Sequence, residues 1–273
     1  MATRVLEFAA LDQLRRRLAQ VPGLVPATLI PPASQGRSEA ACVVPAELVE
    51  PAPLTARSVG GAEPWPGPVA FLDGIQHYEV VAYAGAAPLL VADVAAAVRE
   101  RVGREAHTVL AERRRIAIGR PDVLVAAGGA LHGLATVALA TEEPVHPLRD
   151  LELARVAVDA ARGELERRVG GAYRRSAPHW LVVDGSLSES TAWAADPRMI
   201  GVAKSHATLP FAGDDLVTYL KLPAGQRSNI FRPGSRHRAP VYAWGLRLWD
   251  WAGKDLLYGL VRVEAAPGAE TVR

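Results

Sequence analysis

Apolar residues recur three or four positions apart through residues 146–173, and this is the clearest periodic pattern in the chain. The stretch has a proline in its first turn and a pair of glycines near its end, which are residues that favour the start and the stop of a helix. The pattern predicts one long amphipathic helix. Residues 3–20 show the same spacing, and we expect this shorter helix to pack on the core, with docking to a partner as the alternative.

Short apolar runs bounded by turn residues predict strands. The predicted strands are 69–72, 77–84, 87–91, 180–183, 198–206, 217–222, 239–248 and 256–264. The first three follow one another so closely that they favour an antiparallel meander. A helix is expected to begin near Asp93, in "ADVAAAVRERV", and residues 105–140 are compatible with either helix or strand.

The order of these elements predicts an α/β fold, with a mixed sheet flanked by helices. Residues 21–68 are rich in proline and weakly periodic, so they suit an irregular segment wrapped on the rest, with one short strand in "ACVVPAELV". We therefore expect two parts. Residues 1–67 form the N-terminal helix and the Pro-rich extension, and residues 68–273 form the α/β domain.

Composition narrows the class of protein. The chain has 273 residues, a formal net charge of +2 and one cysteine, Cys42. A single cysteine excludes an internal disulfide and a multi-cysteine zinc site, and it favours a reducing, cytoplasmic setting. The apolar runs are broken before about 18 residues, so no membrane span is expected. Arginines are nevertheless clustered, notably in the loop at 222–238, where they suit phosphate contacts or a solvated loop equally well.

Two predicted strands run into the same dipeptide, Asp73-Gly74 in the first and Asp184-Gly185 in the second. Either dipeptide alone is a common turn signal. Carboxylates at strand ends can also converge at one edge of an α/β sheet, and an acidic residue on a packed helix can join them. Such a cluster would require hard divalent cations, because unscreened carboxylates repel one another. Two ions about 4 Å apart can activate water and stabilise the leaving oxygen of a phosphodiester, which predicts a two-metal mechanism. The residues leave both interpretations open.

Four short blocks, "FLDGIQ", "LRDLELA", "WLVVDGSLSES" and "MIGVAKSH", resemble the NurA nuclease family in sequence and order. The resemblance implies a ribonuclease H-like, Piwi-related fold and a DNA nuclease dependent on Mn²⁺ or Mg²⁺. It implies metal ligation by Asp73, Glu152 and Asp184, and a phosphate contact by Lys204. It also implies a homodimer and a HerA-like hexameric ATPase as partner in DNA end processing.

The sequence departs from the family at two places. The first block reads Asp-Gly-Ile where the family usually has Asp-Gly-Ser, and no histidine follows His237 where the family usually carries one. His206 is a candidate acid/base group, with a structural histidine as the alternative. A second function therefore stays open, namely an inactive nucleic-acid-binding or scaffold subunit.

Alternatives also remain for the helix carboxylate. Glu164 and Glu166 compete with Glu152 on the same helix, and Glu152 alternatively pairs with an arginine one turn away. Asp150 is expected to be a solvated neighbour. Asp214 and Asp215 are expected to cap a helix or to lie in a loop, with extra metal ligands as the alternative.

Overall fold

The computed structural model of the chain describes residues 11–26, 42–61, 63, 65, 67–140, 144–204, 206, 208–234, 239–252, 254 and 256–268. The chain divides into two compact units. The first unit comprises Met1–Gly36, Gly74–Ala97 and Ala111–Val169, and the second comprises Arg37–Asp73, Val98–Leu110 and Gly170–Arg273. The expected division at residue 67 was drawn on composition, whereas these units reflect packing, so that division stays a prediction.

Strands dominate the described residues. They are β1 (Leu24–Pro26), β2 (Cys42–Val43), β3 (Glu47–Leu48), β4 (Arg57–Ser58), β5 (Val69–Ala84), β6 (Ala87–Val102), β7 (Glu105–Gly119), β8 (Ala135–Ala138), β9 (Trp180–Asp184), β10 (Met199–Ala203), β11 (Thr208–Leu209), β12 (Gln226–Arg227), β13 (Phe231–Arg232), β14 (Tyr242–Arg247) and β15 (Leu260–Ala265). The helices are α2 (Pro121–Ala127), α3 (Pro147–Ser176), α4 (Thr191–Ala195), α5 (Gly213–Leu220) and the 3₁₀ turn η1 (Leu187–Glu189).

The main sheet has the strand order β3-β13-β14-β15-β10-β9-β5-β6-β7-β8. Its pairing is mixed. Strand β9 runs parallel to both β5 and β10, whereas β15 is antiparallel to β10 and β14. The predicted mixed α/β sheet flanked by helices is therefore confirmed. No helix among the described residues is long and apolar enough to cross a membrane.

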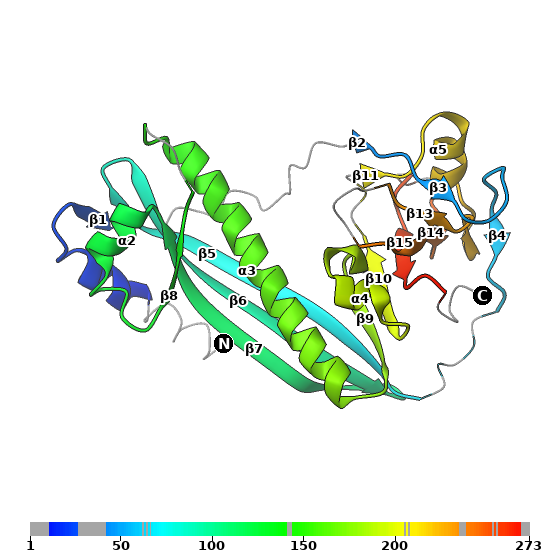
Figure 1. Ribbon diagram of the computed structural model, residues 1–273, viewed down its shortest axis with the longest axis horizontal. Helices are drawn as coiled ribbons and strands as arrows, with labels where there is room; N and C mark the ends of the chain where they lie inside the picture. The colour runs from blue at the N-terminus through cyan, green and yellow to red at the C-terminus, as the bar shows by residue number, and fades with distance from the viewer. Residues whose placement is uncertain are drawn as a thin grey trace. The chain divides into compact units, whose positions relative to one another are not determined.

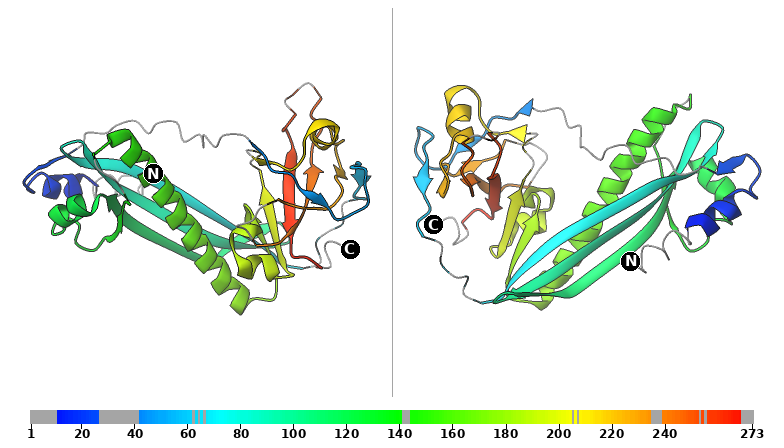
Figure 2. Two further views of the ribbon diagram at one scale, coloured as in Figure 1. Left: turned by 45° about the horizontal axis from the view of Figure 1, so that its top comes forward. Right: turned by 180° about the vertical axis from the view of Figure 1, so that it is seen from behind.

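In the first unit, α3 lies along the long strands β5, β6 and β7, as Figure 1 and both views of Figure 2 show. The predicted long helix is thus confirmed, from Pro147 to Ser176. Residues 11–18 are also helical, and Leu11, Leu14 and Leu18 are buried in the core of this unit. The apolar stripe of the N-terminal pattern therefore packs on the core where it is described, while residues 3–10 lie outside the described residues.

In the second unit, a core of aromatic and aliphatic residues lies between α5 and the strands. Phe211, Tyr219 and Phe231 meet edge to face, with ring centroids 5.1 to 6.3 Å apart. Edge-to-face contacts of this kind are preferred by aromatic rings. These contacts fix α5 against β13.

Three predicted elements were wrong. Residues 69–72 and 77–84 form one strand, β5, so Asp73-Gly74 lies inside a strand instead of at a turn. The helix expected from Asp93 is the strand β6, because its residues alternate between buried and half-buried and this period of two outweighs the alanine content. The strand expected at 217–222 falls mostly in the helix α5, whose first turn carries Asp214 and Asp215.

Candidate functional site

Asp73 and Asp184 lie on neighbouring parallel strands at the same level. Strand β5 pairs with β9 through Leu72 opposite Val183, and the two aspartates follow these residues directly. Adjacent strands are about 4.8 Å apart. The structure thus brings together two of the three carboxylates that the sequence predicted, and it does so by register, although Asp73 ends no strand.

Alternation along the strands places both carboxylates on one face of the sheet. Leu72 and Val183 are buried, whereas Asp73 and Asp184 are exposed. Successive side chains of a strand point to opposite faces. On the buried face, a Cβ added to Gly170 of α3 would lie 2.9 Å from Leu72. Asp73 and Asp184 therefore point to the face opposite the one on which this part of α3 packs.

Two cationic side chains lie on strands or strand ends of this part of the sheet, one paired with Asp184 and one over Phe71. The Lys204 ammonium donates to Oδ2 of Asp184 at 2.7 Å, and 67% of the Lys204 side chain and 39% of the Asp184 side chain are exposed. On the other side, the Arg101 guanidinium lies 5.9 Å from the ring centroid of Phe71, which precedes Asp73 by two residues. Exposed charges of both signs make a surface that can bind a phosphate or a cation without a large desolvation cost.

His206 contacts the backbone. Its Nε2 is 2.9 Å from the carbonyl oxygen of Leu260 in β15, so this nitrogen carries the proton and donates. Burial lowers the pKa of His206, and the bond to Leu260 opposes that shift only in part. The neutral ring therefore has the geometry of a structural histidine, and its role in acid/base chemistry stays a prediction.

The helix carboxylates are arranged differently from the expectation. Glu152 is exposed and accepts from Arg155 at 3.0 Å, which is the local pairing that the sequence left open. The expectation for Asp150 was wrong, because Asp150 is 1% exposed and accepts from Arg120 at 2.7 Å. Glu152 and Gly170 are about 27 Å apart along α3, at 1.5 Å per residue, so Glu152 lies far from the part of α3 that packs on Leu72.

Glu166 is the α3 carboxylate that lies against β5. A Cβ on Gly74 would overlap the Glu166 carboxylate, so only glycine allows this approach. Arg162 donates to Glu166 at 2.5 Å and to Gln76 at 3.0 Å, and Gln76 donates to Asp159 at 2.7 Å. A half-buried polar ladder thus joins α3 to β5 within the first unit.

The donor set fits one hard cation better than two. Asp73 and Asp184 supply carboxylate oxygens, which Mn²⁺ and Mg²⁺ prefer, and water completes such coordination shells. Among the residues that the structure describes, no group of three or more His, Cys, Asp or Glu side chains is arranged to hold a metal ion. The three-carboxylate, two-ion site stays a prediction.

Sequence reasoning missed Glu264. This carboxylate in β15 is 1% exposed, and it accepts from the hydroxyl of Ser186 at 2.7 Å and from the N–H of Leu187 at 2.9 Å. A charged residue in a run of apolar strand residues, "LVRVEA", was the available signal, because carboxylates are rarely buried unless they are paired.

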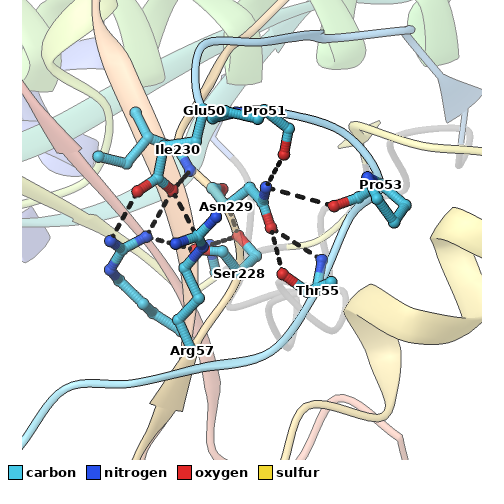
Figure 3. Close-up of polar contacts among 10 residues, drawn as sticks. Glu50, Pro51, Pro53, Thr55, Arg57, Ser228, Asn229 and Ile230 are labelled. Carbon is cyan, nitrogen blue, oxygen red and sulfur yellow. Dashed lines mark hydrogen bonds and ion pairs between the residues drawn. The ribbon is translucent and has the colours of Figure 1, made fainter.

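The arginine loop at 222–238 is partly structural. Figure 3 shows the polar cluster around Glu50 and Asn229 that joins the Pro-rich segment to this loop. Arg227 donates to both carboxylate oxygens of Glu50 at 2.8 and 2.9 Å, and Asn229 bonds to Thr55 and Pro51 at 2.8 Å. Arg232 pairs with Glu47, while Arg236 and Arg238 lie outside the described residues. Arg227 is therefore engaged within the protein.

Comparison with solved structures gives a likeness in fold, whereas comparison of sequences gives none. No protein-family model matches the chain, and no curated protein matches it either. Among solved structures, the crystal structure of the NurA nuclease from Sulfolobus solfataricus is similar, with 9% identity and a TM-score of 0.46 over 78% of this chain and 70% of that one. A likeness at this level supports no statement about activity by itself.

Proposed function

We propose that this chain is a nuclease that hydrolyses DNA phosphodiesters with the help of a divalent cation. The observation that carries the proposal is the paired register of Asp73 and Asp184, with the Lys204 ammonium 2.7 Å from Asp184. Two exposed carboxylates beside an exposed cationic side chain are suited to bind a cation and a phosphate together.

Asp73 and Asp184 would hold the ion. A bound Mn²⁺ or Mg²⁺ would polarise the phosphate and lower the pKa of a bound water. Lys204 would exchange its contact with Asp184 for an oxygen of the scissile phosphate, because an exposed ammonium on a flexible stem can turn at little cost. Arg101 lies on the same side as Phe71 and would contact the nucleic acid backbone.

The remaining expectations belong to this proposal. DNA end processing, a HerA-like hexameric ATPase and a homodimer rest on the resemblance of the four sequence blocks. Glu152 as the helix ligand rests on the same resemblance, because Asp73 and Asp184 point to the face of the sheet opposite α3.

A non-catalytic subunit is the second candidate. It is favoured by the exposed, locally paired Glu152 and by the lack of a three-ligand group among the described residues. Such a subunit would bind nucleic acid or an ATPase through the same surface and cleave nothing.

The deciding experiment is cleavage of labelled linear single- and double-stranded DNA with Mn²⁺. Wild type would be compared with Asp184→Asn and with Asp214→Asn, a matched change at an exposed residue of α5. We expect cleavage by wild type and Asp214→Asn, and a loss of at least about 100-fold in Asp184→Asn. DNA binding without cleavage by any of the three, with a HerA-like ATPase supplied, would establish the second candidate instead.

A further inference from the structure

The turn that follows Asp184 is seated on two strands of the second unit. Gly185 donates its N–H to the carbonyl of Val202 at 3.1 Å, which extends the pairing of β9 with β10 by one residue. Ser186 then begins the 3₁₀ turn η1 by accepting from the N–H of Ser188 at 3.2 Å. The position of this turn therefore determines where β9, and with it Asp184, ends.

Glu264 holds the turn from β15. Its Oε2 accepts from both Ser186 and Leu187, and its Oε1 accepts from Arg262 at 3.0 Å. Leu187 is 0% exposed, so its N–H has no water to bond with and needs this partner. Bonds to an ionised carboxylate are stronger than neutral ones, which makes Glu264 a firm anchor.

Gly201 supports the turn from β10. It lies directly opposite Glu264 in the register of β10 and β15. A Cβ at this position would lie 2.8 Å from the carbonyl oxygen of Gly185 and 3.1 Å from the nitrogen of Leu187. The turn can thus rest on the sheet only because residue 201 has no side chain.

We propose that Glu264 and Gly201 form a seat for residues 185–187 that positions the Asp184 carboxylate, so that Glu264 is a positioning residue for the reaction. The inference rests on the proposed function, because it takes Asp184 as a reacting carboxylate. Reaction rates fall steeply when a reacting group moves even a short distance from its productive position. Glu264 itself touches no substrate, and it acts through Ser186 and Leu187.

The test perturbs the seat from two sides. Ser186→Ala removes one hydrogen bond to Glu264. Gly201→Ala adds a Cβ that displaces the turn from its place on β10. Ser190→Ala, which removes the N-cap of α4 in the same loop, and Gly171→Ala, where the nearest neighbour is the Arg175 side chain at 3.5 Å, are the matched controls. Glu264→Gln adds a nearly isosteric change that keeps an acceptor but removes the charge.

Two readouts are needed. For Ser186→Ala and Gly201→Ala we expect the Mn²⁺-dependent cleavage rate at saturating DNA to fall about 10- to 100-fold. We expect amide exchange at Gly185 and Leu187, measured without metal, to rise about tenfold. Both controls should keep wild-type cleavage and wild-type exchange at these two amides, even if their melting temperatures fall as far as those of the seat variants.

Each outcome decides the matter. If exchange rises while cleavage is unchanged, the seat orders the turn but does not position Asp184, and the inference is wrong. If neither changes, or if cleavage falls while exchange is unchanged, the inference is also wrong. If wild type cleaves nothing, the proposed function fails separately. In that case amide exchange alone tests the seat. If exchange at Gly185 and Leu187 is unchanged in Glu264→Gln and Ser186→Ala, Glu264 does not hold the turn. If exchange rises in both variants, Glu264 holds the turn that follows Asp184.

Discussion

Two ion pairs of the same length have opposite surroundings. Arg120 and Asp150 meet at 2.7 Å in the first unit, where 4% and 1% of their side chains are exposed. Lys204 and Asp184 meet at 2.7 Å in the second unit, where 67% and 39% are exposed. The buried pair cannot exchange its partners without leaving a charge in the core, whereas the exposed pair can. The first therefore stabilises the fold, and the second is available to a ligand.

The largest effect is expected when the buried pair is broken. Asp150→Ala leaves the Arg120 guanidinium without this carboxylate, and we expect the free energy of unfolding to fall by about 3–5 kcal/mol. Urea unfolding would measure the loss. Replacing both partners with apolar residues, in Arg120→Met with Asp150→Leu, should recover most of it, because no buried charge then remains. If Asp150→Ala lowers the free energy of unfolding by less than about 1 kcal/mol, the pair contributes no more than an exposed ion pair, which would contradict this assignment.

An intermediate effect is expected at Glu50, whose side chain is 21% exposed. The bonds from Arg227 lower the pKa of Glu50 from 4.5 to about 2, against a smaller opposing effect of desolvation. A carboxyl group with a depressed pKa stabilises the fold above its unfolded pKa, and this contribution is lost as the pH falls. We therefore expect wild type to lose stability between pH 4.5 and 2 through this group.

Glu50→Gln tests this contribution. Bonds to a charged group contribute about 1.5–3 kcal/mol, so the variant should be less stable by that amount at pH 7 and should change less than wild type on acidification. Melting temperatures from pH 7 to pH 2 would show it. Glu47→Gln is the matched control, because the Glu47 side chain is 74% exposed and pairs with Arg232 on the surface. Parallel pH profiles for wild type and Glu50→Gln would contradict the assignment.

Some helices and strands could be predicted from the sequence, and others could not. The period of 3.6 predicted α3 because that helix presents one apolar face to the sheet, and the apolar run at 180–183 predicted β9. Strand β6 was misread because alanine favours a helix, and the pairing in the sheet overrode this preference. Local pattern therefore predicted the elements in which residue preference and burial agree.

The candidate site was only partly predictable for a related reason. Asp73 and Asp184 were found because each follows an apolar run, and the pairing of β5 with β9 then brought them together. The burial of Asp150 was missed because its partner is Arg120, 30 residues away, whereas the pairing of Glu152 within one turn was foreseen. Partners distant in sequence leave no local signal of their identity. The apolar run around Glu264 indicated burial, but it did not indicate the contacts with Ser186 and Leu187.

A smaller effect on stability is expected at the exposed pair. Lys204→Met should change the free energy of unfolding by no more than about 1 kcal/mol, because exposed pairs contribute little. The same variant should bind DNA more weakly and with a shallower dependence on salt, because one phosphate contact is lost. Fluorescence anisotropy at several salt concentrations, beside urea unfolding, would separate the two effects. A large loss of stability with unchanged DNA binding would reverse the roles assigned to the two ion pairs.

The smallest effect on stability is expected at Glu152, where a local pair with Arg155 contributes at most about 0.5 kcal/mol. Glu152→Gln should therefore unfold like wild type, and its cleavage rate can be interpreted without correction for stability. Loss of cleavage would identify Glu152 as the helix ligand that the sequence motif implies. Retained cleavage is the outcome that the geometry favours, because Asp73 and Asp184 point to the face of the sheet opposite α3. In that case α3 supplies no ligand, and Asp73 and Asp184 hold the ion.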